Sequence, residues 1–247
     1  MIHAKPLQFL FVAFLMLLPV NAHADETLDR AEIEKIIREY LVENPEIMLE
    51  VQEALGRKQA DELVARQAET IKQEQEMLFN SPYQIEFGNP DAAVTIVEFF
   101  DYNCGFCQRA MADMEQILES DSENVRFVLK EFPVLGEQSI EASRVSLAFA
   151  QLAPEKIGEF HTTLLSQDGI KDGEMALQLA VALGANEDEM RGEMEKPYII
   201  DALTEVYRVA EDLGVTGTPS YIVGENVVFG AVGYEQLKQE IEKQQQQ

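Results

Sequence analysis

Thr95-Ile96-Val97-Glu98-Phe99-Phe100-Asp101-Tyr102-Asn103-Cys104-Gly105-Phe106-Cys107-Gln108-Arg109 is the stretch that decides the fold of this chain. Its first half is almost continuously apolar, which predicts a strand over 94–100 that is covered on both faces. A helix from Cys104 to about Glu119 is predicted to follow directly. Cys104 and Cys107 are the only cysteines in the protein. We interpret them as a redox-active dithiol at the start of this helix.

The spacing of the two cysteines suits thiol chemistry. Residues three apart lie on one side of the first helical turn, so their sulfur atoms can meet as a disulfide. The free N–H groups and the positive end of the helix dipole favour a thiolate on Cys104. Cys107 lies one turn further in and is expected to be more buried and less acidic. Cys104 is therefore the predicted nucleophile and Cys107 the resolving thiol.

Three other uses of the cysteines compete with this interpretation. A structural disulfide across so short a loop would constrain the unfolded chain little. A zinc site needs about four ligands, and the only histidines are His3, His23 and His161. A Cu(I) site is chemically allowed, because two thiolates, with Met111 or Met114, are soft ligands. Helical spacing favours these methionines as core residues instead, so no metal is the leading expectation.

The N-terminus has the pattern of a secretory signal peptide. Lys5 precedes an apolar run over 7–20, and Ala22-His23-Ala24 matches an A-x-A cleavage site, so residues 1–24 are expected to be removed before Asp25. The run is short for a membrane span, and an uncleaved anchor is the less favoured alternative. We expect a periplasmic protein, exported to a compartment where dithiols and disulfides interconvert.

Composition narrows the choice of partners. The length of 247 residues allows one or two domains, and the formal charge is -26. Removal of residues 1–24 deletes one positive charge, that of Lys5, and takes the formal charge to -27. This acidity argues against nucleic acids and anionic membranes as partners and favours unfolded or basic protein clients.

Residues 25–80 are predicted to form a helical stalk. One helix should end at Asn44, and Pro45 suits the first turn of a second helix that runs to about Leu78. Residues of this second helix keep a spacing of four and three, which is typical of a narrow coiled-coil seam, although the repeat is short and one of its members is a glutamine: Val64, Ala68, Ile71, Gln75 and Leu78. A solvated linker helix and an oligomerisation segment both fit the pattern. A long polar helix is hard to stabilise alone, which favours a homo-oligomer through 25–80.

Residues 81–243 are predicted to form an α/β domain with a thioredoxin fold. A second strand is expected over 125–130, a helical insertion over about 135–213, and a hairpin with strands at 221–223 and 227–229. A last helix should run from about Tyr234 to Lys243, with 244–247 disordered. The order of strands and helices fits a thioredoxin core with a helical insertion. Pro219 stands just before a core strand, and a cis Thr218-Pro219 bond would explain it.

Two charged residues lie in the predicted core strands. Glu98 is a carboxylate inside an apolar strand, and Lys130 closes the neighbouring strand. Such residues suggest a buried pair near the dithiol, where pKa values are usually perturbed. The alternative is that both side chains point to solvent at strand ends.

Taken together, these residues resemble the DsbA-type thiol:disulfide oxidoreductases of the thioredoxin superfamily. The resemblance rests on Glu98-Phe99-Phe100, Cys104-Gly105-Phe106-Cys107, Lys130 and Thr218-Pro219, and it covers about 94–243. The N-terminal helices, with Glu43-Asn44-Pro45-Glu46, resemble the subgroup that contains the copper-sensitivity suppressor ScsC.

The resemblance carries expectations about the site. It implies a cis-proline loop at Thr218-Pro219, opposite the dithiol, that pairs with the backbone of a client peptide. We place the dipeptide Gly105-Phe106 in the same client-binding surface. The resemblance also implies that Glu98 and Lys130 form a buried pair that moves protons to and from Cys107. No cofactor is expected beyond the redox-active disulfide of the two cysteines.

One departure from the family pattern matters. Strongly oxidising members have Pro-His between their cysteines, whereas this chain has Gly105-Phe106. Because one donor to the Cys104 thiolate is then missing, we expect a higher thiolate pKa and a less oxidising disulfide than in DsbA.

Several functions remain open at this point. The leading one is exchange of disulfides with exported protein clients, with an isomerase or reductase role favoured by the stalk. A DsbA-like disulfide donor, kept oxidised by a membrane redox partner, is the alternative. A Cu(I)-binding protein of a copper-tolerance system and a structural oligomer with an inert disulfide belong to other classes.

Overall fold

The computed structural model of the chain describes residues 29–246, which divide into two compact units at Leu55 and Gly56. The first unit contains helix α1 (Arg30–Glu43) and the beginning of helix α2 (Ile47–Gln73). Asp29 caps α1, because its carboxylate accepts a hydrogen bond from the N–H of Glu32. The second unit contains the rest of α2 and all later elements.

Helix α1 keeps its apolar stripe in contact with solvent. No residue of α1 is buried, and four large side chains of the stripe are exposed: Ile33, Ile36, Ile37 and Tyr40. The amphipathic pattern read from the sequence is thus present, but the described part of the chain does not cover it.

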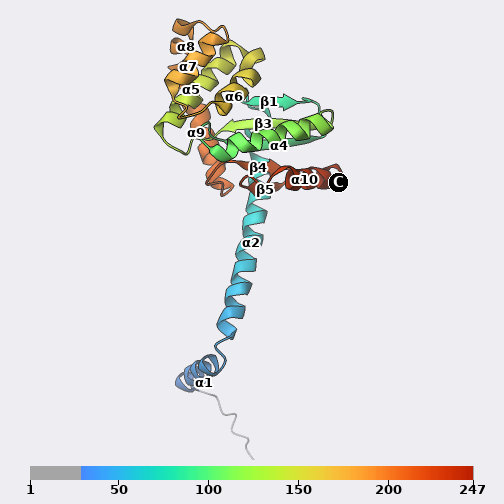
Figure 1. Ribbon diagram of the computed structural model, residues 1–247. Helices are drawn as coiled ribbons and strands as arrows, with labels where there is room; N and C mark the ends of the chain where they lie inside the picture. The colour runs from blue at the N-terminus through green and yellow to red at the C-terminus, as the bar shows by residue number, and fades with distance from the viewer. Residues whose placement is uncertain (1–28, 247) are drawn as a thin grey trace, which may run out of the picture. The chain divides into compact units, whose positions relative to one another are not determined.

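The second unit is built on a five-stranded sheet with the order β1-β3-β2-β4-β5 (Figure 1). Its strands are β1 (Ile85–Gly88), β2 (Val94–Phe100), β3 (Val125–Glu131), β4 (Ser220–Val223) and β5 (Asn226–Phe229). Only β2 and β3 are parallel; the other neighbours are antiparallel. The sequence predicted four of these strands and missed β1, an edge strand of four residues beside a turn.

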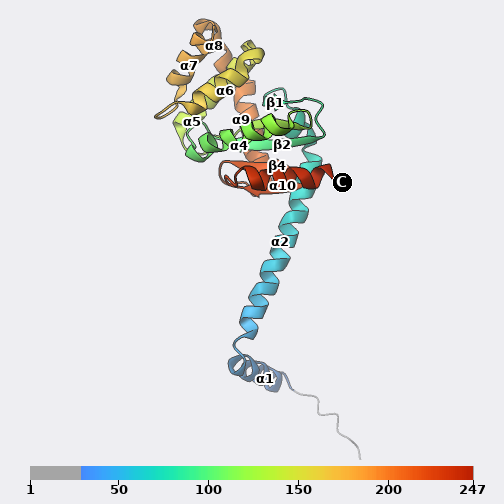
Figure 2. The same ribbon diagram turned by 45° about the vertical axis from the view of Figure 1, so that its right-hand side comes forward.

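Helices cover both faces of the sheet. Helix α4 (Gly105–Asp121) and helix α10 (Tyr234–Gln245) lie side by side along one face, which carries Ile96 and Phe100 of β2 (Figure 2). The opposite face carries Val97 and Phe99 of the same strand. The sheet is therefore buried on both faces, as the continuous apolar run of β2 predicted.

The expected helical insertion separates β3 from β4. It consists of α5 (Glu137–Leu152), a 3₁₀ turn (Pro154–Lys156), α6 (Ile157–Ser166), α7 (Gly173–Ala182), α8 (Glu187–Met194) and α9 (Pro197–Asp212). Helices α5 to α8 pack on the edge of the same core that α4 covers, and α9 also reaches the opposite face. The thioredoxin-like α/β fold with an inserted helical subdomain is confirmed.

The C-terminal half of the predicted stalk packs against the second unit of its own chain rather than against another copy. The helix expected to reach Leu78 breaks at Glu74, and helix α3 (Gln75–Asn80) follows. Ile71 and Leu78 are buried in the core of the second unit, and the Gln67 amide donates to the carbonyl of Leu213 over 2.7 Å. The coiled-coil interpretation is therefore wrong for this half, because its apolar residues pack on their own domain. The part of the predicted stalk from Gln67 onward thus packs on the domain that was expected to begin at residue 81.

The predictions for the two ends of the chain can be compared with the structure only in part. Helix α10 continues to Gln245, so the tail expected to be disordered from Gln244 is helical at its start. The expected signal peptide over 1–24 and the last residue lie outside the described residues. Within 29–246, none of the helices combines the length and apolar character needed to cross a bilayer.

The packing of α2 yields a first prediction. Ile71 is 3% exposed and Val64 is 57% exposed, although both belong to the predicted seam. Ile71→Ala should lower the free energy of unfolding by about 2–5 kcal/mol, because it leaves a cavity in a packed core. Val64→Ala should change it by less than about 0.5 kcal/mol. Urea unfolding of both variants measures this; equal losses for the two variants would mean that a seam, not the domain core, buries them.

Candidate active site

The dithiol stands where β2 passes into α4. Cys104 is the N-cap of α4 and has extended backbone angles, while Cys107 lies in the first helical turn. Cys104 is 6% exposed and Cys107 is 1% exposed. Both are free thiols in this structure. The sequence-based arrangement, with a reachable first thiol and a more buried second thiol, agrees with this geometry.

The loop before β4 lies against the first thiol. The Thr218-Pro219 peptide bond is cis, which confirms the prediction from the position of Pro219. The Cys104 Sγ atom is 3.2 Å from the carbonyl oxygen of Thr218, 114 residues away in the sequence. The fold therefore brings together the dithiol and the proline loop, as the resemblance implied.

The surroundings of Cys104 favour its thiolate. A hydrogen bond from the Cys107 thiol is the largest cause and lowers the pKa of Cys104 to about 5, although burial opposes this effect. The Thr218 side chain and the backbone N–H groups of Cys107 and Phe106 add to the stabilisation. DsbA has a pKa of about 3.5 for its nucleophile. That the pKa of Cys104 is higher than that of the DsbA nucleophile stays a prediction, which titration of the thiolate would test.

The same contact has the opposite effect on Cys107. Its pKa is raised far above the ordinary value for a thiol, first by its hydrogen bond to Cys104, then by burial and by the charge of Glu98. One proton is therefore shared very unequally by the two sulfur atoms. Near neutral pH, Cys104 carries a negative charge and Cys107 keeps its proton.

Glu98 is the carboxylate of the thiol face. It is 5% exposed, and its strand neighbours are Leu129 on β3 and Tyr221 on β4. The pKa of Glu98 is raised to about 8, mainly by burial and in smaller part by the negative charges of Cys104 and Asp113. A buried carboxyl group with this pKa can accept or donate a proton near neutral pH.

Lys130 does not belong to this site, so the expected Glu98–Lys130 pair is wrong. In the parallel register of β2 and β3, Lys130 is opposite Phe99, whereas Glu98 is opposite Leu129. Side chains of successive strand residues point to opposite faces, so Glu98 and Lys130 lie on different sides of the sheet. Because Lys130 pairs with the residue after Glu98 rather than with Glu98 itself, the two charges lie on opposite faces.

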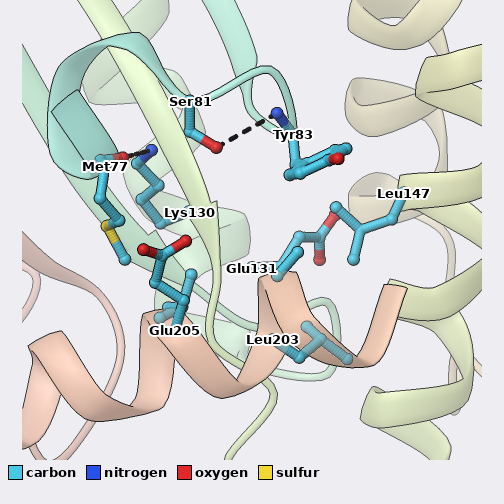
Figure 3. Close-up of a pocket in the computed structure, with 10 residues that line it drawn as sticks. Met77, Ser81, Tyr83, Lys130, Glu131, Leu147, Leu203 and Glu205 are labelled. Atoms are coloured by element: carbon cyan, nitrogen blue, oxygen red, sulfur yellow. Dashed lines mark hydrogen bonds between the residues drawn. The ribbon is translucent and has the colours of Figure 1, made fainter. Parts of the chain in front are cut away.

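Lys130 instead holds the segment that enters the domain. Its Nζ atom donates to the carbonyl oxygen of Met77 (Figure 3). It also donates to the Gln84 side chain over 2.7 Å. Burial lowers the pKa of Lys130 to about 7, and the nearby Glu205 carboxylate opposes this effect. These contacts hold α3 against β3 on the face of the sheet opposite the dithiol, which is a structural role.

Asn103 is a residue of the site that sequence reasoning missed. Its amide donates to the Lys171 carbonyl over 2.8 Å and to the Ser139 hydroxyl over 3.0 Å, and it accepts from the Lys171 N–H over 2.8 Å. The backbone N–H of Asn103 also bonds the buried Asp101 carboxylate. The residue before Cys104 is thereby fixed to the helical insertion. Only the local preference of Asp and Asn for turns hinted at it.

Several large apolar side chains are exposed near Cys104. Phe106 is 58% exposed, and the guanidinium of Arg109 lies 4.3 Å from the centre of its ring. Leu135 is also exposed, and its backbone N–H donates to the Asp101 carboxylate in the loop before Cys104. Ile170 is exposed as well and precedes Lys171, which bonds Asn103 in the same loop. Exposed large apolar side chains that gather near a reactive group are typical of a surface that binds other molecules.

Comparison with known proteins agrees with this geometry. Residues 95–242 match the family model of the DSBA-like thioredoxin domain, which is more than half of the chain. The chain belongs to this family. Residues 29–62 match a second model, the copper resistance protein ScsC N-terminal domain.

Solved structures with similar folds include two relatives of the whole domain. A thioredoxin-like oxidoreductase from Silicibacter pomeroyi DSS-3 is 35% identical, with a TM-score of 0.65, over 70% of this chain and 98% of the other. ScsC from Proteus mirabilis, in a transitional conformation, is 28% identical, with a TM-score of 0.64, over 88% of this chain and 97% of the other.

Two curated proteins are similar to part of the chain. Disulfide bond formation protein D of Bacillus subtilis is 22% identical over 166 residues, which cover 64% of this chain and 75% of that protein. Na(+)/H(+) antiporter NhaA 1 of Mycobacterium sp. strain KMS is 27% identical over 145 residues, or 55% of this chain. The chain spans about a fifth (22%) of the length of such antiporters.

A second buried polar cluster of this DsbA-like domain lies under the insertion. The Glu131 carboxylate accepts from the Ser143 hydroxyl over 2.6 Å, and its other oxygen has no partner. Tyr102 bonds Ser146 over 2.8 Å and lies 3.4 Å from the His161 ring nitrogen. Burial raises the pKa of Glu131 to about 8 and lowers that of His161 to about 3. His161 is thus a neutral residue buried in the core.

The described residues contain no cluster of three or more side chains that could bind a metal ion. Among 29–246, no group of three or more His, Cys, Asp or Glu side chains is placed to hold a metal ion. This observation does not bear on a two-thiolate Cu(I) site, which needs only the dithiol.

The bonds of Asn103 lead to a second prediction. Asn103→Ala should lower the free energy of unfolding by about 1–3 kcal/mol, because the backbone groups of Lys171 lose their partners in a half-buried place. Gln108→Ala, which removes an exposed bond to Ser166, should cost less than about 0.5 kcal/mol. Chemical denaturation compares the two variants. Similar small losses would show that the Asn103 contacts are not formed in solution.

Glu131 gives the stability of the domain a pH dependence. Its folded pKa of about 8 is above the ordinary value, so its contribution is present at low pH and is lost as the pH rises through about 8. Glu131→Gln should therefore gain stability relative to the natural protein between about pH 5 and pH 8.5. Urea titrations across this range measure the change. Glu137→Gln, an exposed control on α5, should leave the pH dependence unaltered.

Proposed function

We propose that this chain is an exported thiol:disulfide oxidoreductase that exchanges disulfides with protein clients through Cys104 and Cys107. The observation that carries the proposal is the unequal sharing of one proton: the pKa of Cys104 is lowered to about 5 while that of Cys107 is strongly raised. Membership of the DsbA-like family supports it, as does the similarity to a protein named for disulfide bond formation.

The chemistry follows from these two thiols. The Cys104 thiolate attacks a client disulfide, so that a Cys104–client bond forms and one client thiolate leaves. Cys107 then loses its proton to Glu98 and attacks the Cys104 sulfur, which releases the second client thiolate and leaves a Cys104–Cys107 disulfide. The client is reduced by two electrons and the dithiol is oxidised by two. The reverse sequence transfers the disulfide to a client.

Unfolded polypeptides suit the surface around the dithiol. The Thr218-Pro219 loop stands beside Cys104 and offers backbone groups for strand-like pairing with an extended client. The exposed Phe106 ring, with Leu135 and Ile170, would contact apolar side chains that a folded client keeps buried. We assign Gly105, Phe106, Thr218 and Pro219 to this client surface.

An isomerase or reductase role is favoured over disulfide donation. The uncovered apolar stripe of α1 and the match to an ScsC N-terminal domain both support association of several copies through the N-terminal helices. Several dithiols in one particle could act on one misfolded client, and association would limit access of a membrane oxidant. We place the protein in the periplasm, with a membrane redox partner that returns the dithiol to its working state.

Copper binding is a second candidate function. The specific observation in its favour is the match of residues 29–62 to a domain named for copper resistance. In this case the two thiols would bind one Cu(I) ion, and disulfide exchange would be secondary. Retention of one Cu(I) per dithiol against a strong chelator would support this function.

Titration of Cys104 is the most direct prediction of the site. The alkylation rate of the reduced protein should rise with pH around a midpoint of about 5, because only the thiolate reacts. Cys107→Ala should raise this midpoint, because it removes the hydrogen-bond donor that is the largest cause of the lowered pKa. A midpoint near 8.5, that of an ordinary thiol, would contradict the proposed site.

The direction of exchange is decided with a scrambled multi-disulfide protein. The reduced chain, without residues 1–24, should restore the activity of the scrambled protein, and removal of residues 25–55 should weaken this effect if association matters. Fast oxidation of a reduced client by the disulfide form, without isomerisation, would instead make it a disulfide donor. If the protein catalyses neither isomerisation nor oxidation but retains Cu(I), the result would support the copper function.

A further inference from the structure

An arginine lies against the dipeptide between the two cysteines. Arg109 is on α4, one helical turn after Gly105, and its guanidinium carbon is 4.3 Å from the centre of the Phe106 ring. Its Nη1 atom is 4.0 Å from the point where a side chain at Gly105 would begin. A positive charge is therefore present at the exposed edge of the dithiol motif.

The position of Arg109 on its helix explains this placement. Residues three and four apart on a helix are neighbours on one face, and Gly105, Phe106 and Arg109 are all exposed. Cys107 is on the buried face of the same helix. The guanidinium is thus on the side from which a client must approach Cys104, and not on the side that holds the resolving thiol.

The guanidinium of Arg109 has no acidic partner in the described part of the chain. Four residues further along a helix is the usual place for one, and Asp113 is found there. The Asp113 carboxylate instead accepts the backbone N–H of Tyr234 over 3.1 Å, at the start of α10. Other exposed arginines differ in this respect, since Arg191 pairs with Glu187 and Arg208 with Glu74.

The contact with the Phe106 ring suits the guanidinium for binding an anion. Arginine presents five N–H donors in a planar fork that matches the two oxygens of a carboxylate. A guanidinium held on an aromatic ring loses less freedom when it binds, because part of its movement is already restricted. Glycine at position 105 leaves that side of the fork uncovered. The donors of Arg109 are thus open to a group that the client supplies.

A carboxylate is the complementary group, although the protein as a whole repels it. The formal charge of the chain is -26, so acidic clients approach against a negative field. Salt screens exposed charges beyond about 8–10 Å, whereas an ion pair forms at direct contact. An unpaired cation beside the dithiol can therefore reverse, at this one place, the preference that the net charge imposes.

We propose that Arg109 is a specificity-determining residue that binds a client carboxylate close to the reacting cysteine. The inference rests on the disulfide exchange proposed above and names the clients that react fastest. Arg109 is five residues after Cys104, which corresponds to about 7 Å along a helix. An extended client advances about 3.3 Å per residue, so an Asp or Glu two residues from its cysteine spans this distance on the same side of the strand.

Three peptides of equal length test the inference. Each carries one cysteine as a mixed disulfide with 2-thiopyridine, and the residues two positions before and after it are both Glu, both Gln or both Lys. The Cys104 thiolate of the reduced protein attacks the peptide sulfur, and the bond between this sulfur and the pyridyl sulfur breaks. The pyridine-2-thiolate leaves with the electron pair and takes a proton from water. The absorbance of pyridine-2-thione thus measures the attack with a leaving group that is the same for all three peptides.

The ratio of the rate constants for the Glu and Lys peptides is the quantity to compare. A change in the reactivity of Cys104 itself cancels in this ratio. Arg109→Gln should lower the ratio about threefold or more, because the client carboxylate loses its partner. Arg109→Lys, which keeps the charge but loses the fork, should retain part of the preference. The difference between Arg109→Gln and the natural protein should shrink at high salt.

Arg66→Gln is the matched control. It removes an exposed arginine from α2, so it changes the net charge of the protein by the same amount. It should leave the Glu-to-Lys ratio unaltered. A fall in Arg66→Gln as large as that in Arg109→Gln would show that the net charge sets the preference, and the role of Arg109 would be overturned.

The remaining outcomes separate this inference from the proposed function. Equal Glu-to-Lys ratios in Arg109→Gln and the natural protein would overturn the specificity role, while release of pyridine-2-thione would still support exchange through Cys104. No release from any of the peptides would overturn exchange through Cys104 itself.

Discussion

The hydrogen bond between the two thiols is the interaction on which the rest of the site depends. It is the largest cause of both pKa shifts, and it lowers the pKa of Cys104 as it raises that of Cys107. It forms only because β2 delivers Cys104 to the N-cap of α4, which places Cys107 in the first turn beneath it. Thr218 and the first backbone N–H groups of α4 then reinforce a charge that the thiol contact has already localised.

The parallel register of β2 and β3 divides the charged residues of the core between two faces. Glu98 shares its face with the thiols, and Lys130 shares the opposite face with α3. A lysine beside Glu98 would hold the carboxyl group in its ionised form. The actual neighbour is Leu129, so the pKa of Glu98 is raised to about 8, and the carboxyl group can accept a proton from Cys107 and release it again near neutral pH. The register thereby decides which charged residue takes part in thiol chemistry.

Local sequence was sufficient for the features that depend on neighbouring residues. The strand over 94–100, the dithiol at the start of α4 and the cis bond before Pro219 each follow from a few adjacent side chains. The spacing of Ile71 and Leu78 also showed correctly that one face of a helix is buried. It could not show against what, because intramolecular and intermolecular packing demand the same apolar period. The partner turned out to be the domain's own sheet.

Contacts between distant segments were beyond such reasoning. Asp113 meets Tyr234 across 121 residues, and Asn103 meets Lys171 across 68, without any pattern that links them. The pairing of Glu98 with Lys130 failed for a related reason. Both residues were correctly placed in core strands, but their faces depend on a register that a shift of one residue reverses. Buried polar residues are visible in a sequence, whereas their partners are fixed only by the fold.

The strong acidity of the chain does not prevent a thiolate at Cys104, and the reason is distance. Every group that lowers the pKa of Cys104 is in hydrogen-bonding contact with it. Most of the carboxylates that produce the charge of -26 are on the surface, where salt screens charges beyond about 8–10 Å. Buried carboxylates are screened far less: Glu98 and the Cys104 thiolate repel each other, and Glu98 also raises the pKa of Cys107. A few short-range donors can therefore stabilise one anion inside a protein of the same sign, while the net charge acts on the solubility and on the approach of clients.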